Sequence, residues 1–399
     1  MDAYPEYEVI IVGAGPASGC AAFHLASAGR RVLVLEKDRL PRYKACGGGL
    51  SAGLLAQFPF SFEPVVETCI NQVTYALGKR TVSIALPPGS ICMVMRDRFD
   101  AYLLERSGAE VRQEMFVRSV SEQTDRVVLE TKSGETFQSR YLIGADGANS
   151  TVARAVGLRR NRHMLAAIEA EVRAPPEVLK RFQNNPLFVF GELRYGYLWV
   201  FPKAEHLSVG ITALRPERGQ LQATLFRVME EYGISLEGAE LHGHPIPIYM
   251  RREPIATART LLVGDAAGLV DPLTGEGIRF GIQSGRLAAE AILSGHAERY
   301  PHLVQRQIGF SHSLGAGLAY LFYRFPRLCF SLGVSNPFAT GIFVDLLSNR
   351  ADYLGVWARL AGTLPLYLAV EGLAALAGLA AGPRGRQKLR DRVYSGLAS

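Results

Sequence analysis

The chain has 399 residues, of which 48% are hydrophobic and 20% charged, a composition that is ordinary for a globular protein with a large core and argues against disorder. Its net charge of +7 is typical of a mildly basic globular protein, or of one attracted to anionic lipid head groups or phosphates. No basic stripe is interleaved with aromatic residues, so nucleic acid is not expected as a partner. The five cysteines are scattered without a C-x-x-C pair, which predicts a reducing compartment and neither a metal site nor a disulfide scaffold.

In chain order, the first element is a buried strand at residues 8–15, "EVIIVGAG". A helical pattern follows and stops at Gly29, and a second strand, "RRVLVLEK", comes next. This order predicts a βαβ unit and an α/β fold with a doubly wound, Rossmann-like domain. The chain enters the first strand without the basic region or cleavage site of a signal peptide, which favours a cytoplasmic location.

The turn after the first strand, "GAGPAS", is typical of a dinucleotide-binding fingerprint. Gly13 permits the tight turn, and Gly15 lets the backbone approach a pyrophosphate at the positive end of the following helix. Ser18 takes the place of the usual third glycine and is small enough to preserve the helix–strand packing. Glu36 ends the second strand at the right distance to hold a ribose hydroxyl pair, which favours FAD or NAD over NADP.

The next segment, "PRYKACGGGLS" (Pro41–Ser51), combines one cysteine with three consecutive glycines. Glycines leave the backbone without side-chain cover, which a chain accepts where a ligand or another backbone must come close. Cys46 lies at the edge of this bare stretch.

Strand-like runs alternate with turns over residues 69–96 and 164–254, and they predict an inserted mixed or antiparallel sheet. Residues 1–68, 97–163 and 255–300 are expected to form the nucleotide-binding domain. Within the second run, "HGHP" carries His242 and His244, which are expected to face solvent because a third metal ligand is missing.

In "GYLWVFPK", the alternate residues Tyr197, Trp199 and Phe201 share one face of a strand. That face is either packed on the core or forms an aromatic wall for a long apolar ligand. Lys203, at the end of the strand, is expected either in solvent or near a phosphate head group.

Residues 301–399 are predicted to form a helical C-terminal cap. The tail "LPLYLAVEGLAALAGLAAG" contains Pro365 and Glu371, which disfavour a spanning helix. A packed helix pair is expected instead, or a segment lying on a membrane surface. Four basic residues would lie beside that surface: Arg384, Arg386, Lys388 and Arg390.

Three segments, "RDRFDAYLLE", "GADGANSTVAR" and "GDAAGLVDPLTGEGI", resemble motifs of FAD-dependent oxidoreductases of the aromatic-hydroxylase type. The resemblance implies that FAD is the cofactor and that Asp265 binds its ribityl chain. It also implies that the amides of Gly277 and Ile278 face the isoalloxazine, where a helix N-terminus stabilises the anionic reduced flavin. Arg98 is the implied partner of the FAD pyrophosphate. Because the sequence has one nucleotide fingerprint, the electron donor, NADPH or reduced ferredoxin, is expected to visit transiently.

The cysteine–glycine loop and the aromatic strand resemble the geranylgeranyl reductase family, over roughly residues 7–300. The resemblance implies that Cys46, Gly47 and Gly49 line the flavin, and that the aromatic strand contacts a prenyl chain. The implied activity is saturation of double bonds in a geranylgeranyl or other polyprenyl chain, carried on a diphosphate, phospholipid, chlorophyll or quinone.

In this activity reduced flavin would deliver the hydride, and Cys46 is the expected proton donor. Tyr197, a positioned water or a purely structural cysteine are the alternatives. A monooxygenase that hydroxylates an aromatic or isoprenoid compound shares the FAD scaffold and is the alternative function. The expected partners are a prenyl lipid, an electron-donor protein and a membrane surface.

Overall fold

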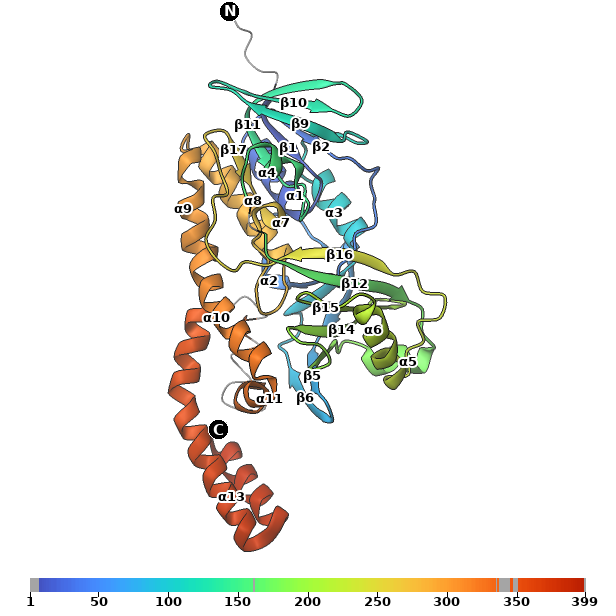
Figure 1. Ribbon diagram of the computed structural model, residues 1–399, viewed down its shortest axis with the longest axis vertical. Helices are drawn as coiled ribbons and strands as arrows, with labels where there is room; N and C mark the ends of the chain where they lie inside the picture. Colours follow the sequence, from blue (N-terminus) through green and yellow to red (C-terminus); the bar gives the residue numbers. More distant parts are fainter. Residues whose placement is uncertain (1–6, 161, 335, 337–344, 347–350, 398–399) are drawn as a thin grey trace, which may run out of the picture.

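The computed structural model describes residues 7–160, 162–334, 336, 345–346 and 351–397. This part of the chain forms an elongated molecule with one sheet at its upper end, a second sheet below it, and the C-terminal helices along one side (Figure 1). The predicted mixed α/β fold with a helical C-terminal region is confirmed.

The first sheet has a parallel centre, extended on one side by an antiparallel hairpin. In spatial order its strands are β8 (Glu110–Arg112), β2 (Val32–Leu35), β1 (Tyr7–Val12), β11 (Thr136–Gly144), β10 (Val127–Thr131) and β9 (Val117–Glu122), and β17 (Thr260–Leu262) also pairs with β11. Strands β8, β2, β1, β11 and β17 are parallel, whereas β10 and β9 are antiparallel to their neighbours. The apolar runs of β1 and β2 are almost fully buried, as strands covered on both faces require.

Two helices of this part pack with their backbones in contact. Helix α1 (Pro16–Ser27) lies against α8 (Ile278–Leu293), and a Cβ added to Gly285 would lie 2.3 Å from the carbonyl oxygen of Ala17. The close packing of α1 against α8 therefore requires glycine at position 285. This packing brings the N-termini of both helices to one cavity. The other helices here are α3 (Arg96–Glu105), α4 (Thr151–Ala155) and α7 (Gly264–Ala267).

The second sheet combines strands from two separate stretches of the chain. Its order is β16 (His242–Pro247), β12 (Met164–Val172), β15 (Leu207–Ala213), β14 (Gly196–Pro202), β13 (Leu187–Phe190), β5 (Gln72–Leu77) and β6 (Arg80–Ala85). The β13–β5 pair is parallel and the other pairs are antiparallel. Helices α5 (Pro176–Phe182) and α6 (Gln220–Glu231) belong to this part. The predicted domain boundaries stay a prediction.

A third, small sheet connects the glycine loop to the rest of the molecule. It consists of β3 (Gly49–Ser51), β7 (Ile91–Val94) and β4 (Val66–Ile70), and α2 (Ala52–Leu55) follows β3. Because β3 begins at Gly49, the cysteine–glycine loop is held by strand pairing on its C-terminal side.

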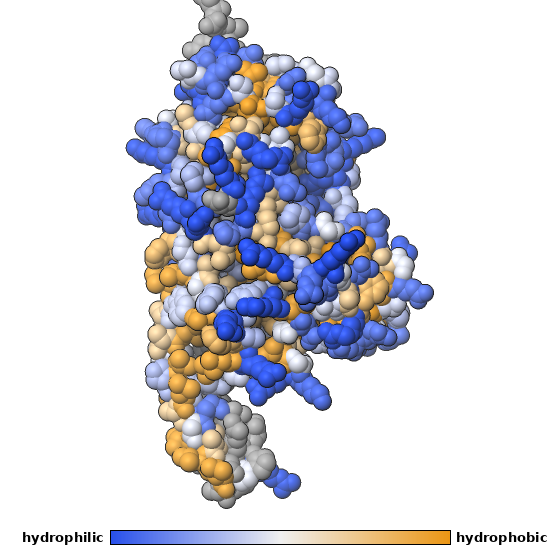
Figure 2. All heavy atoms as spheres, in the orientation of Figure 1, coloured by the Kyte–Doolittle hydropathy of each residue, from blue (hydrophilic) through white to orange (hydrophobic). Residues whose placement is uncertain are grey.

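The C-terminal cap consists of α9 (Tyr300–Val304), α10 (Phe310–Arg324), α11 (Pro326–Cys329) and α13 (Tyr353–Leu397), with a kink in α13 at Gly382. Hydrophobic residues gather on its surface at the lower left of Figure 2. One helical segment, Tyr353–Ala377, is long and apolar enough to cross a membrane, and most of it is not buried in the protein. Length and composition alone do not separate a spanning helix from one that lies on a surface. Arg384 is exposed, and the side chains of Arg386, Lys388 and Arg390 lie outside the described residues.

Candidate functional site

A cavity of about 720 Å³ runs from the glycine turn after β1 to the aromatic face of β14. Elements of all three sheets meet around it. Its walls include the N-termini of α1 and α8, the loop that precedes β3, and strands of the second sheet. Most of the residues singled out in the sequence line this one cavity, although they are spread over more than 260 positions from Gly13 to Ile278.

The nucleotide end of the cavity is a turn that only glycine permits. Gly13 has φ +100°, and a Cβ there would lie 2.4 Å from the carbonyl oxygen of Ala145. Glu36 is buried beside this turn, where its carboxylate accepts backbone N–H bonds from Ala14 (2.7 Å) and Asp38 (3.0 Å). Each carboxylate oxygen keeps a second lone pair, so the group can still accept from ribose hydroxyls.

Ser18 does not line the cavity, in contrast to its predicted place among the cofactor-binding residues. The residue is fully buried within α1. Its neighbour Gly19 faces α3, where an added Cβ would lie 2.7 Å from Leu103. This part of the fingerprint therefore serves helix packing, which explains why small residues occupy it.

The structure does not support the prediction that Arg98 contacts the pyrophosphate. The Arg98 side chain is half exposed, lies outside the cavity lining and pairs with Glu67 at 3.1 Å. Arg96, the first residue of α3, lines the cavity instead and lies beside Gly15. Its guanidinium bonds both oxygens of Asp100, at 2.8 and 2.9 Å, and this pair holds the pKa of Arg96 above its usual range.

The i to i+4 spacing of Arg96 and Asp100 was the sequence signal that distinguishes the two arginines. The same carboxylate also accepts from Arg42 at 3.0 Å, and Arg42 in turn donates to the carbonyl oxygen of Ala14. Asp100 thus holds two guanidinium groups next to the glycine turn, where a diphosphate would receive them.

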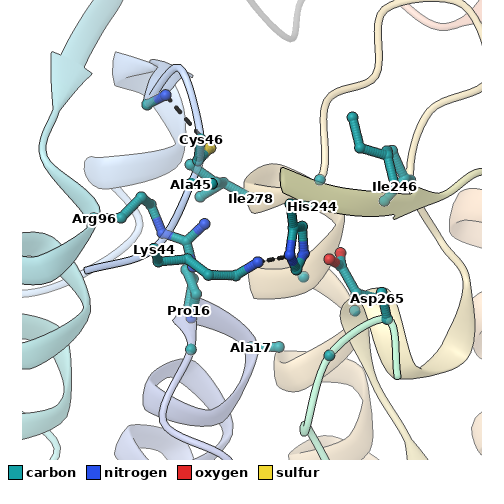
Figure 3. A pocket seen from close by; sticks show the side chains of 18 of the residues that line it. Pro16, Ala17, Lys44, Ala45, Cys46, Arg96, His244, Ile246, Asp265 and Ile278 are labelled. Carbon is teal, nitrogen blue, oxygen red and sulfur yellow. Dashed lines mark hydrogen bonds between the residues drawn. The ribbon is translucent and has the colours of Figure 1, made fainter. Parts of the chain in front are cut away.

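A lysine and a histidine that the sequence did not assign to the site meet inside the cavity. Lys44 Nζ contacts His244 Nε2 close to Asp265, as Figure 3 shows. The expectation that His242 and His244 face solvent is wrong, because both line the cavity from β16. Burial lowers the pKa of Lys44 to about 8; burial and then the Lys44 charge lower the pKa of His244 to about 3.

Lys203 holds the cysteine–glycine loop in place. Its side chain is buried, so it lies neither in solvent nor where a phosphate head group could reach it. Its buried ammonium donates to the carbonyl oxygens of Gly47 (2.7 Å) and Val94 (2.8 Å). Gly48 has φ +70°, and a Cβ there would lie 2.0 Å from the Val94 oxygen. The Gly48 amide donates to Cys46 Sγ at 3.4 Å. The Cys46 thiol also lies within interaction range of the Arg96 guanidinium.

The aromatic face of β14 forms the other end of the cavity. Tyr197, Trp199 and Phe201 all line it, so the wall is not simply core packing. Trp199 lies over Gly210 of β15, where a Cβ would come within 2.1 Å of the indole. A Cβ on Gly47 would lie 2.5 Å from the Phe201 ring, so the bare loop and the aromatic wall are in direct contact.

The third wall of the cavity is the loop that leads into α8. Gly277 is the N-cap residue of α8 and Ile278 is its first residue, and both line the cavity. A Cβ on Gly277 would lie 3.3 Å from Asp265 Oδ1, so the carboxylate and the helix N-terminus are adjacent. The Tyr197 hydroxyl donates to the Thr274 carbonyl oxygen at 2.6 Å and thereby ties this loop to β14.

The geometry fits a dinucleotide at one end and an apolar chain at the other. Glycine positions without room for a Cβ and two helix N-termini suit a pyrophosphate and an anionic ring. At the aromatic end, the buried Trp199 Nε1 has no hydrogen-bond partner among the described residues, which leaves a donor available to a ligand.

The family model and the related sequences of known proteins agree on one family. The family described as "FAD binding domain" matches residues 6–300. The chain is 33% identical over 316 residues to a chloroplastic geranylgeranyl diphosphate reductase of Oryza sativa subsp. japonica, which covers 72% of this chain and 67% of that protein. It is 30% identical over 366 residues to a menaquinone reductase of Mycolicibacterium smegmatis, covering 83% and 87%.

Among solved structures, a geranylgeranyl bacteriochlorophyll reductase-like protein of Thermoplasma acidophilum superimposes with a TM-score of 0.75. The match covers 91% of this chain and 98% of that protein at 24% identity. This likeness shows that the two proteins share a fold, including much of the part beyond residue 300.

We expect Arg96→Ala to weaken FAD binding by about 10- to 100-fold, because a buried charge-assisted hydrogen bond contributes about 1.5–3 kcal/mol. Asp100 keeps Arg42 as a partner in this variant, so the fold should survive. The dissociation constant is measured by titrating apoprotein with FAD and following flavin fluorescence. Arg98→Ala, on the same helix, is the matched control and should bind FAD like the parent; a larger loss in that variant would contradict the assignment.

Proposed function

Because the chain belongs to the geranylgeranyl reductase family of FAD-binding proteins, we propose that it saturates carbon–carbon double bonds of a polyprenyl chain. The observation that carries this proposal is the contact between the Gly47 backbone and the ring of Phe201. At this contact the nucleotide-binding end of the cavity meets its apolar end. A double bond of the prenyl chain could therefore lie against the flavin ring. The carrier of the prenyl chain is a diphosphate, a phospholipid, a chlorophyll or a quinone.

Residues at the polar end would hold the cofactor. Gly13 and Gly15 leave room for the pyrophosphate beside Arg96, and Glu36 would accept from the ribose hydroxyls. Asp265, which lines the same cavity, would bind the ribityl chain. The amides of Gly277 and Ile278 and the bare loop at Cys46, Gly47 and Gly49 would surround the ring. Reduced FAD supplies the hydride, and its electrons would come from NADPH or reduced ferredoxin in transient contact.

The aromatic end would hold the alkene and keep water away from it. An isolated trisubstituted alkene is a poor electrophile, so its reduction requires close positioning and a proton for the second carbon. The Tyr197 hydroxyl already donates to the loop before α8, and burial raises its pKa well above the usual range. Cys46 Sγ accepts from a loop amide, and its own proton is not bound to a carbonyl oxygen in the described residues. We therefore assign the proton to Cys46.

The exposed surface of the cap supports contact with a lipid bilayer. Leu366, Leu373 and Leu376 of α13 are all about half exposed or more, and so are Phe325 and Leu328 near the α10–α11 junction. Arg324 and Arg327 stand next to these last two side chains in the sequence, where they can meet anionic head groups. A membrane surface of this kind would present a prenyl lipid close to the protein.

The function is tested anaerobically with full-length, FAD-loaded protein whose flavin has been reduced by dithionite. Geranylgeranyl diphosphate, a geranylgeranylated phospholipid and a menaquinone are added in turn, and flavin reoxidation and product mass are followed. We expect reoxidation with a gain of two hydrogens per double bond for at least one of them. If the flavin stays reduced with every prenyl compound, but hydroxylates an aromatic or isoprenoid compound once oxygen is admitted, the protein is a monooxygenase.

Cys46→Ala should retain FAD but slow alkene reduction by about 100-fold, since general acid catalysis contributes about 10²–10⁴-fold. Single-turnover reoxidation with the best prenyl substrate measures this. Cys329→Ala, on α11 and outside the cavity lining, is the matched control. Turnover at the parental rate in the Cys46 variant would make this cysteine structural.

The double variant Phe325→Glu and Leu328→Glu should reduce binding to anionic vesicles by at least about tenfold, because burial of each apolar side chain contributes about 1.5–3 kcal/mol. Co-sedimentation with phosphatidylglycerol-containing vesicles measures the bound fraction. Phe226→Glu changes a similarly exposed phenylalanine on α6 and should leave binding unchanged. Equal vesicle binding by the parent and the double variant would rule out this surface.

A further inference from the structure

The loop that leads into α8 (Asp271–Gly277) has two sides. Its inner side, from Thr274 to Gly277, lines the cavity and ends at the amides that would face the flavin. Its outer side is covered by the C-terminal cap, which lies beyond the end of the family match at residue 300. Whatever fixes this loop also fixes the direction in which its amides point.

Three tyrosine hydroxyls from three different elements hold the loop. Tyr197 of β14 donates to the Thr274 carbonyl oxygen at 2.6 Å. Tyr323 of α10 donates to the Leu273 carbonyl oxygen at 3.0 Å, and Tyr353 at the start of α13 donates to Asp271 Oδ1 at 2.8 Å. Two of these three donors therefore belong to the cap.

Asp271 organises the backbone of the loop. Its Oδ1 accepts from the backbone N–H groups of Leu273 (2.9 Å) and Thr274 (2.8 Å) in addition to the Tyr353 hydroxyl. The carboxylate is 1% exposed, and its Oδ2 has no partner among the described residues. A buried carboxylate needs all of its donors, so the loss of the tyrosine hydroxyl would disturb the same oxygen that shapes the turn.

Tyr353 is itself held in one orientation. Its side chain is 1% exposed and packs over Gly315, where an added Cβ would lie 2.5 Å from the ring. Its backbone N–H donates to Ser311 Oγ at 3.2 Å. The hydroxyl is therefore positioned by α10 and α13 together, and Leu273 of the loop packs against the same cluster of side chains.

We propose that Tyr353, assisted by Tyr323, is a positioning residue of the flavin site, which makes the C-terminal cap a part of that site. The inference rests on FAD binding in the proposed function, and not on the identity of the prenyl substrate. By fixing Asp271, Tyr353 sets the aim of the Gly277 and Ile278 amides. These amides stabilise the negative charge of reduced flavin, so Tyr353 favours the reduced form over the oxidised form.

The test compares Tyr353→Phe with the parent as full-length, FAD-loaded protein. The midpoint potential of the bound flavin is measured together with the FAD dissociation constant and the melting temperature. We expect reduced FAD to lose about tenfold more affinity than oxidised FAD, given the size of helix N-terminal charge effects. For a two-electron couple this corresponds to a potential about 30 mV more negative.

Tyr367→Phe is the matched control. Tyr367 lies on the same helix, and its hydroxyl donates to the Ser331 carbonyl oxygen at 3.0 Å, away from the loop. Both variants lose one tyrosine hydrogen bond to a protein acceptor, so both can lower the melting temperature. A change in potential in the Tyr353 variant alone is the result that a merely structural role would not produce.

An unchanged flavin potential in Tyr353→Phe, with or without a lower melting temperature, would overturn the proposal. If that variant does not fold, Tyr323→Phe is measured instead, and it must shift the potential in the same direction or the proposal fails. The comparison requires bound FAD and no lipid. A parent protein whose flavin reacts with no prenyl compound would therefore refute the reductase function without deciding this inference.

Discussion

The arrangement of the site depends on the backbone contact between α1 and α8. Gly285 has no room for a Cβ against Ala17, and Gly264 and Gly281 approach each other nearby. Ala17 and Gly281 lie in the first turns of α1 and α8 and are close together, so the two helix N-termini meet and two sets of free N–H groups point into one cavity. Side chains at the crossing would separate the helices, and the pyrophosphate end would no longer lie beside the ring end.

The apolar end is joined to this arrangement by one buried lysine. Lys203 projects from the second sheet and binds carbonyl oxygens of the glycine loop and of β7 in the third sheet. It therefore fixes the distance between the aromatic wall and the bare backbone. A buried ammonium is costly unless it is fully bonded, which makes its position well defined. The cavity is thus continuous because polar contacts, and not apolar packing alone, set the spacing of its walls.

The sequence was sufficient for the fold class and the family, and most of the residues it singled out line the cavity, because glycine motifs have few structural solutions. It was insufficient wherever the answer depended on the direction of a side chain. Arg96 and Arg98 are two residues apart on α3; the spacing to Asp100 singles out Arg96, but only the helix orientation shows that this face of α3 meets the cavity. His244 was taken for a loop residue because β16 is too polar to read as a strand. The contact from Tyr353 to Asp271 spans 82 positions and follows no local pattern.

The burial of Tyr353 has a consequence for shortened forms of the protein. A chain that ends before α13 would lose the ring that fills the space over Gly315, and Asp271 would lose a donor. If such a shortened protein failed to bind vesicles or to turn over substrate, the loss of interior contacts would explain the failure as well as the loss of the exposed surface. A shortening that begins after Ala377, past the apolar stretch, removes neither contact. The first turn of α13 is part of the interior of the enzyme, whereas farther along the helix buried side chains such as Tyr367 and Val370 alternate with exposed leucines.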